Sequence, residues 1–197
     1  MTGMQWWVTL ITKLLINNMF SIFQNDLTKL LKSGKKPVKM MAYYNQGDSK
    51  LCTFFSSATN ICYNTWLYIH DSDVRTLGKD HTIASSEQTS QKMAEHYKLK
   101  AYKVDVKDWI KRGTQWSIIV SLSVEPKFYL DGMDGKVEEL HKAKIGWHSV
   151  CLRREDKKIL LINSWWNQKG KQEYDITGVI MGMLANGSLK DKGIIIA

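Results

Sequence analysis

The sequence predicts an α+β fold in which an early helix packs on an antiparallel β-sheet. In residues 53–69, apolar side chains recur at the spacing of one helix face. Residues 146–166 read GWHSVCLRREDKKILLINSWW, in which two apolar stretches flank a charged turn, as in a β-hairpin. An early helix followed mainly by strands is typical of α+β domains. The 197 residues correspond to one domain with an extension.

The first element is an apolar segment, residues 4–32, with side chains near helical spacing. Lys13, Asn17 and Asn18 interrupt it, so we do not expect a membrane span. Neither Lys nor Arg precedes its apolar part, unlike a secretory signal. We therefore predict a helical extension and linker over residues 1–38 and the main domain over residues 39–197. The extension has three candidate roles: packing on the domain or a larger assembly, membrane-surface attachment, and removable inhibition.

The middle of the chain alternates between helical and extended patterns. Residues 85–97 are predicted to form a helix capped by Ser85 or Ser86. Residues 99–106 are expected to be extended, followed by a short helix over 106–112 that ends at Gly113. Residues 116–122 and 128–130 are predicted as further strands. With the hairpin of residues 146–166, these strands complete the antiparallel sheet.

The hairpin is predicted to bring a histidine and an asparagine together. A turn at Glu155-Asp156 pairs residue 152 with 159, 150 with 161, and His148 with Asn163. Directly opposed side chains in an antiparallel pair lie within contact range. The imidazole and the carboxamide then supply a general base and the group that orients it. A slip of one residue would instead move Asn163 to the other face.

Cys52 is the candidate nucleophile among the three cysteines. Cys151 has the opposite strand parity to His148, and Cys62 lies on the apolar helical stripe, so both are expected in the core. Cys52 opens the helix, where the positive end of the helix dipole favours the thiolate. Gln46 precedes it by five intervening residues. Its amide can donate to a developing oxyanion together with the backbone N–H of Cys52.

The order Gln-x5-Cys, His, Asn-Ser-Trp resembles the papain-like cysteine peptidases, whose triad is Cys-His-Asn. The resemblance implies that Cys52 is the nucleophile, His148 the base and acid, Asn163 the orienting group and Gln46 the oxyanion donor. It also implies a papain-like fold that needs no cofactor. Further matches are Phe55-Ser56 after the nucleophile and Trp165, which in the family covers the His–Asn hydrogen bond.

The sequence departs from the family pattern at several positions. Ser49 stands where the family has a disulfide cysteine, Thr53 replaces the aromatic residue after the nucleophile, and Trp166 replaces a glycine. The middle segment, with TSQKMAEHYKLKAYKV and GTQWSIIVSLS, is more similar to compact bacterial peptidases that process bacteriocin leaders. The resemblance therefore indicates a divergent, compact member.

Composition limits the metal sites, cellular compartments and binding partners that we expect. Three cysteines without a Cys-x-x-Cys motif argue against zinc and favour a reduced compartment, or a bacterial or viral context. His70 with Asp71 and Asp73 is interpreted as a polar helix end, and His81, His96 and His141 are assigned no chemistry. The net charge of +9 suits a solvated surface or attraction to an anionic partner such as a cell wall. The sequence has no compact run of Lys and Arg interleaved with aromatic residues, so we do not predict specific nucleic-acid binding.

The predicted activity is hydrolysis of peptide bonds in a protein or peptide by a papain-like endopeptidase. Two alternatives stay open. A peptidoglycan amide hydrolase would use the same thiol chemistry on an anionic wall. A non-catalytic structural or binding protein would keep a decayed peptidase fold, but all four functional positions are filled.

Overall fold

Six antiparallel strands form one sheet in the order β1-β6-β2-β3-β4-β5 among the described residues of this computed structural model. The structure describes residues 27–38, 42–47, 49–79, 85–123, 147–164 and 173–197. The strands are β1 (Ala101–Asp105), β2 (Ile118–Ser123), β3 (Trp147–Glu155), β4 (Lys158–Ile162), β5 (Glu173–Asp175) and β6 (Leu189–Ile196). The helices are α2 (Leu27–Lys32), α3 (Cys52–Asn64), α4 (Asp71–Lys79), α5 (Ser86–His96), α6 (Val106–Arg112) and α8 (Ile180–Ala185). The predicted mixture of helices and an antiparallel sheet is confirmed.

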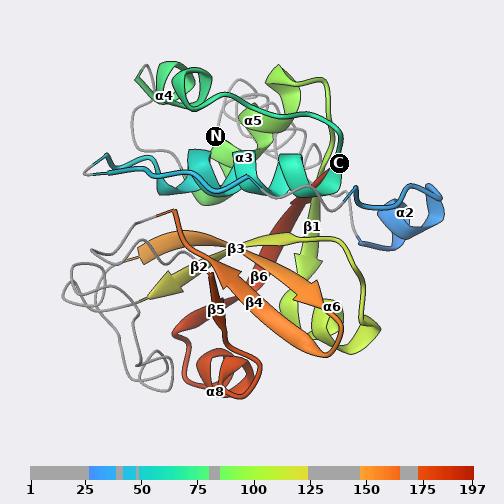
Figure 1. Ribbon diagram of the computed structural model, residues 1–197. Helices are drawn as coiled ribbons and strands as arrows, with labels where there is room; N and C mark the ends of the chain where they lie inside the picture. The colour runs from blue at the N-terminus through green and yellow to red at the C-terminus, as the bar shows by residue number, and fades with distance from the viewer. Residues whose placement is uncertain (1–26, 39–41, 48, 80–84, 124–146, 165–172) are drawn as a thin grey trace, which may run out of the picture.

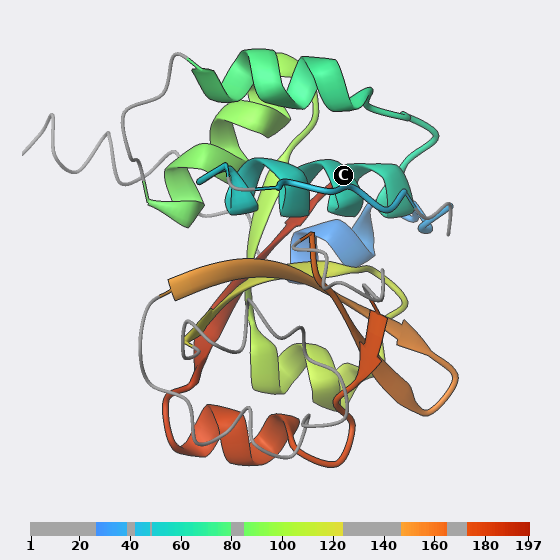
Figure 2. The ribbon, with the colours of Figure 1, turned by 60° about the vertical axis from the view of Figure 1, so that its left-hand side comes forward.

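The sheet lies between two groups of helices. Helices α3, α4 and α5 lie on one side, and α6 and α8 lie on the other (Figures 1 and 2). Each side has its own apolar core. Phe55 and Ile61 of α3 belong to the first core, whereas Trp109 of α6 and Met183 of α8 belong to the second. Helix α2, from the predicted extension, buries Leu27 and Leu30 in the second core.

A buried polar network fastens the end of α3 to the sheet. The Asn60 amide donates to Ser117 Oγ at 2.8 Å and its carbonyl oxygen accepts from the Ile196 backbone N–H at 2.8 Å. One turn later, Asn64 Oδ1 accepts from the Ser117 backbone N–H at 3.0 Å. Buried polar groups are costly unless they are hydrogen-bonded. The network thus fixes one position of α3 along the sheet, and with it the position of Cys52 at the other end.

Several predicted elements are confirmed almost to the residue. Ser85 caps α5 through a capping box with Gln88, and α6 spans residues 106–112. Gly113 ends α6 with a φ of 62°, a conformation that suits glycine. Helix α3 is shorter than its apolar stripe predicts, because it ends at Asn64 and leaves Trp66 83% exposed. The predicted strand at residues 128–130 lies outside the described residues.

The β3–β4 hairpin has a different register from the predicted one. Leu152 pairs with Leu161 and Glu155 with Lys158, so the turn is Asp156-Lys157, and the prediction of a turn at Glu155-Asp156 was wrong. Asp156 adopts a φ of 51°, which Asp tolerates and which tight hairpin turns require. The correction shifts the pairing by two residues. Because side chains alternate with a period of two, every side chain keeps its predicted face.

Candidate active site

His148 and Asn163 meet at the open end of the β3–β4 hairpin. His148 is the second residue of β3, Asn163 directly follows β4, and both side chains are buried. The distance from His148 Nε2 to Asn163 Oδ1 is 2.7 Å. The amide oxygen is an acceptor, so Nε2 carries the proton and donates it. The other ring nitrogen, Nδ1, is then the one able to accept a proton from a thiol.

Cys52 is the first residue of α3 and faces this imidazole. Burial raises the pKa of the Cys52 thiol, but hydrogen bonds and charge, with those of His148 the largest among them, lower the pKa to about 7. A backbone hydrogen bond from Ser149 also lowers this pKa, and the Thr53 hydroxyl adds to the effect. The first turn of a helix presents unpaired N–H groups that favour an anion. The thiol is therefore prepared to ionise near neutral pH.

The other two cysteines lie in different environments. Cys62 is fully buried in the core beneath α3, and burial raises the pKa of its thiol. Cys151 is also buried, on β3, and burial raises its pKa to about 12. Their expected positions in the core are confirmed. A low pKa and partial exposure mark a reactive cysteine, and only Cys52 of the three combines them.

Gln46 lies in the segment before α3, with its side chain almost wholly buried. Its Oε1 accepts a 2.6 Å hydrogen bond from Ser164 Oγ, and its backbone N–H donates to the Ser164 carbonyl at 2.9 Å. Its Nε2 donates to the Ser49 carbonyl at 3.0 Å. An amide nitrogen carries two hydrogens, so one donor is left after this bond. Ser164 therefore fixes the Gln46 amide with its nitrogen turned toward the loop before Cys52.

A cluster of hydroxyls adjoins the cysteine and histidine. Thr53 Oγ1 and Ser149 Oγ are 2.7 Å apart, Ser149 Oγ and Ser86 Oγ are 3.0 Å apart, and Ser121 Oγ donates to Ser86 Oγ at 3.2 Å. The cluster joins α3, β3, α5 and β2 at one point. Thr53 follows Cys52, and Ser149 follows His148, so their contact helps to fix the spacing of Cys52 and His148.

These hydroxyls and Ser164 were missed as site residues by sequence reasoning. Ser164 and Ser149 stand next to Asn163 and His148, and that adjacency was the available signal. Ser86 and Ser121 gave no such signal in the sequence, because they reach the site only through the packing of α5 and β2. Trp165, predicted to cover the His–Asn hydrogen bond, lies outside the described residues.

Within the described part of the chain, no group of His, Cys, Asp and Glu is arranged to hold a metal ion. His70 precedes α4, and its Nδ1 lies 2.9 Å from Ser72 Oγ. Its carbonyl accepts from the backbone N–H groups of Asp73 and Val74, as at a helix start. The interpretation of His70, Asp71 and Asp73 as a polar helix end is thus confirmed. Of the helices described, none is long and apolar enough to cross a membrane.

Comparison with known proteins finds similarity in structure alone. No family model matches the sequence, and no curated protein matches it. Among solved structures, the fold is similar to the peptidase domain of Streptococcus ComA, a bi-functional ABC transporter involved in a quorum sensing pathway. The TM-score is 0.50 at 10% identity, over 78% of this chain and 96% of that one. The chain therefore resembles a peptidase domain in its arrangement of helices and antiparallel sheet.

Proposed function

We propose that this protein is a papain-like cysteine peptidase that hydrolyses peptide bonds through Cys52, His148 and Asn163. One observation carries the proposal: a cysteine with a lowered pKa, at a helix N-terminus, beside a histidine that a buried asparagine orients. A nucleophile, its base and an orienting third group are the parts that covalent acyl transfer requires. The similarity of fold to a peptidase domain supports the same reaction class.

The proposed reaction begins when the Cys52 thiolate attacks the carbonyl carbon of the scissile peptide bond. The backbone N–H of Cys52 and the free donor of Gln46 stabilise the oxyanion that forms. The imidazolium of His148 then donates its proton to the leaving amine as the C–N bond breaks, which leaves a thioester on Cys52. Water attacks the thioester while His148 accepts its proton. The acid product leaves, and the thiol–imidazole pair is restored.

Asn163 acts on this reaction through the imidazole. Its Oδ1 holds the ring by Nε2–H and directs Nδ1 toward the thiol. Ser164 acts in the same way on Gln46, since its hydroxyl engages the amide oxygen and so assigns the nitrogen to the donor side. Both are positioning residues. Positioning errors of about 1 Å can cost about 10²-fold in rate.

The test is hydrolysis of casein and of a synthetic peptide mixture, with cleavage sites read by mass spectrometry. We expect cleavage by the unmodified protein and none by Cys52→Ala or His148→Ala. His70→Ala is the matched control, because His70 is exposed and lies outside the site. Purified peptidoglycan, assayed in parallel, examines the alternative substrate of the same chemistry. If neither substrate is cleaved while Cys52 is readily alkylated, the proposal of a peptidase is wrong.

A further inference from the structure

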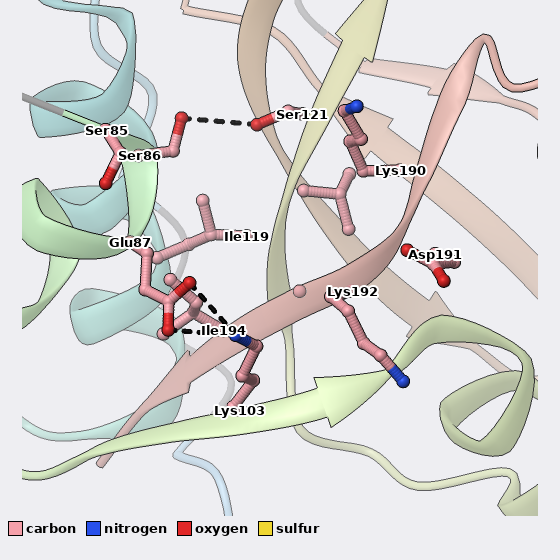
Figure 3. Close-up of a pocket in the computed structure, with 12 residues that line it drawn as sticks. Ser85, Ser86, Glu87, Lys103, Ile119, Ser121, Lys190, Asp191, Lys192 and Ile194 are labelled. Carbon is pink, nitrogen blue, oxygen red and sulfur yellow. Dashed lines mark hydrogen bonds and ion pairs between the residues drawn. The ribbon is translucent and has the colours of Figure 1, made fainter. Parts of the chain in front are cut away.

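A pocket of about 350 Å³ lies between the start of α5 and strands β2 and β6. Figure 3 shows its lining residues: the N-cap Ser85 with Ser86 and Glu87 of α5, Ile119 and Ser121 on β2, and Lys190, Asp191, Lys192 and Ile194 on β6, with Lys103 on β1. Its volume falls within the range of small-molecule and side-chain sites. The pocket is thus large enough for one substrate side chain.

An interruption of the β2–β6 ladder creates this pocket. Val120 pairs with Gly193 and Leu122 with Leu189, so the single residue Ser121 lies opposite three residues of β6, 190–192. A bulge of this kind bends the strand and turns side chains out of the ladder. Gly193 leaves no room for a side chain, because a Cβ there would lie 2.5 Å from Ile118 Cδ1 and 2.8 Å from the Ile119 carbonyl oxygen. The irregular backbone therefore borders the hollow, and residues 190–192 line it.

Two contacts place the pocket beside the proposed catalytic histidine. Ser86 Oγ, in the pocket wall, is 3.0 Å from Ser149 Oγ, which follows His148 in β3. On the other side, the Lys190 amine lies 4.1 Å from the ring centroid of Trp147, which precedes His148. Trp147 is 54% exposed. The pocket therefore adjoins the residues on both sides of His148 in β3.

Among the described residues, the charges of the pocket pair two of its three lysines with a carboxylate and leave Lys190 without one. The Lys103 amine contacts both Glu87 oxygens at 3.0 Å, and the Lys192 amine is 3.0 Å from Asp105 outside the pocket. Lys190 contacts only the Trp147 ring among the described residues. In Figure 3 the Lys190 amine lies toward Ser121, whereas Asp191 lies on the opposite side of β6 from Ser86. The Ser121 hydroxyl already donates to Ser86, and Ser86 contacts Ser149, so the Lys190 cation is the polar group that the pocket offers to a ligand.

We propose that this pocket selects an acidic side chain of the substrate, with Lys190 binding its carboxylate. This inference rests on the proposed peptidase function, since it names the class of peptide that the site accepts. An ammonium suits a carboxylate, and hydrogen bonds between charged groups are the stronger ones. A lysine substrate residue would meet Lys190 as a like charge, and an apolar one would offer the ammonium no counter-charge.

The experiment compares matched peptides that differ at one position near the scissile bond, carrying Glu, Gln, Leu or Lys. We expect kcat/KM to be about tenfold higher for Glu than for Gln at the position that enters the pocket. Lys190→Gln is expected to abolish this ratio, and Lys190→Glu to favour Lys over Glu. Lys192→Gln is the matched control. It removes the same charge two residues from Lys190, but Lys192 is already neutralised by Asp105.

The same peptides are also bound to the Cys52→Ala protein and measured by fluorescence anisotropy. One outcome is that no peptide is cleaved, but the Glu peptide binds about tenfold more tightly than the Gln peptide and this preference depends on Lys190. The pocket assignment would then be supported, and the proposed peptidase function would be wrong. If peptides are cleaved or bound without a Glu preference, the pocket assignment is wrong. Equal effects of Lys190→Gln and Lys192→Gln would also overturn it, because they would indicate a general field rather than a site.

Discussion

Replacing His148 with alanine is expected to slow alkylation of Cys52 at acidic pH and to leave it fast at alkaline pH. The thiolate is the reactive form of a cysteine. His148 is the largest of the influences that lower the Cys52 pKa, and burial alone acts in the opposite direction. Without the imidazole, the pKa of Cys52 should therefore rise toward its ordinary value of 9.0.

The magnitude follows from the difference between a pKa of about 7 and the ordinary value of 9.0. At about pH 6, Cys52 is mostly protonated in both the unmodified protein and the variant, so the variant has about 100-fold less thiolate. A thiolate of higher pKa is intrinsically more nucleophilic, with a Brønsted coefficient of about 0.4–0.5. Each thiolate of the variant should therefore react about tenfold faster. The net expectation is alkylation about tenfold slower at this pH. Above about pH 9 the thiolate fractions converge, and the variant should react as fast as the unmodified protein or faster.

The assay is iodoacetamide labelling of the native protein across pH, with each cysteine followed by mass spectrometry. The unmodified protein should show a midpoint near pH 7 for Cys52, set by its lowered pKa. Cys62 and Cys151 serve as internal references, because both are buried and should label slowly until the protein unfolds. His70→Ala is the control for a general effect of replacing a histidine with alanine. Circular dichroism checks that each variant is folded.

A midpoint that stays near pH 7 in His148→Ala would falsify the assignment of the lowered pKa to this imidazole. A midpoint of about 8.5 or above in the unmodified protein would mean that Cys52 is an ordinary thiol. In either case the thiol–imidazole pair would not be the source of reactivity.

Three further variants examine neighbouring contacts. Thr53→Val removes a hydroxyl that lowers the pKa of Cys52 and should move its labelling midpoint to higher pH, whereas Thr53→Ser should restore it. Ser164→Ala leaves the buried Gln46 Oε1 without its 2.6 Å donor, so denaturant unfolding should show a loss of about 1–3 kcal/mol, with lower peptide hydrolysis. Trp109→Ala empties a fully buried site and should lower unfolding free energy by about 3–5 kcal/mol, with a smaller loss for Trp109→Phe.

Much of the local structure could be predicted from sequence, because its causes are local. The capping box of Ser85 and Gln88 and the glycine end of α6 depend on residues within a few positions of each other. The β3–β4 turn was misplaced, since Glu155-Asp156 and Asp156-Lys157 are both charged pairs and neither is a strong turn signal. The end of α3 was also missed, because the apolar pattern continues past Asn64 although the helix does not.

By itself, the sequence determined which residues could carry the chemistry and on which faces they lie. The period of two in a strand puts His148 and Asn163 on the same face in either register, so a shift of two residues left this prediction intact. Only the tertiary structure decided the rest. The Ser164–Gln46 bond, the hydroxyls that join Thr53 to Ser149, and the pocket at the β6 bulge each join segments far apart in the chain. Such contacts depend on how helices and sheet pack, and no short-range pattern encodes that packing.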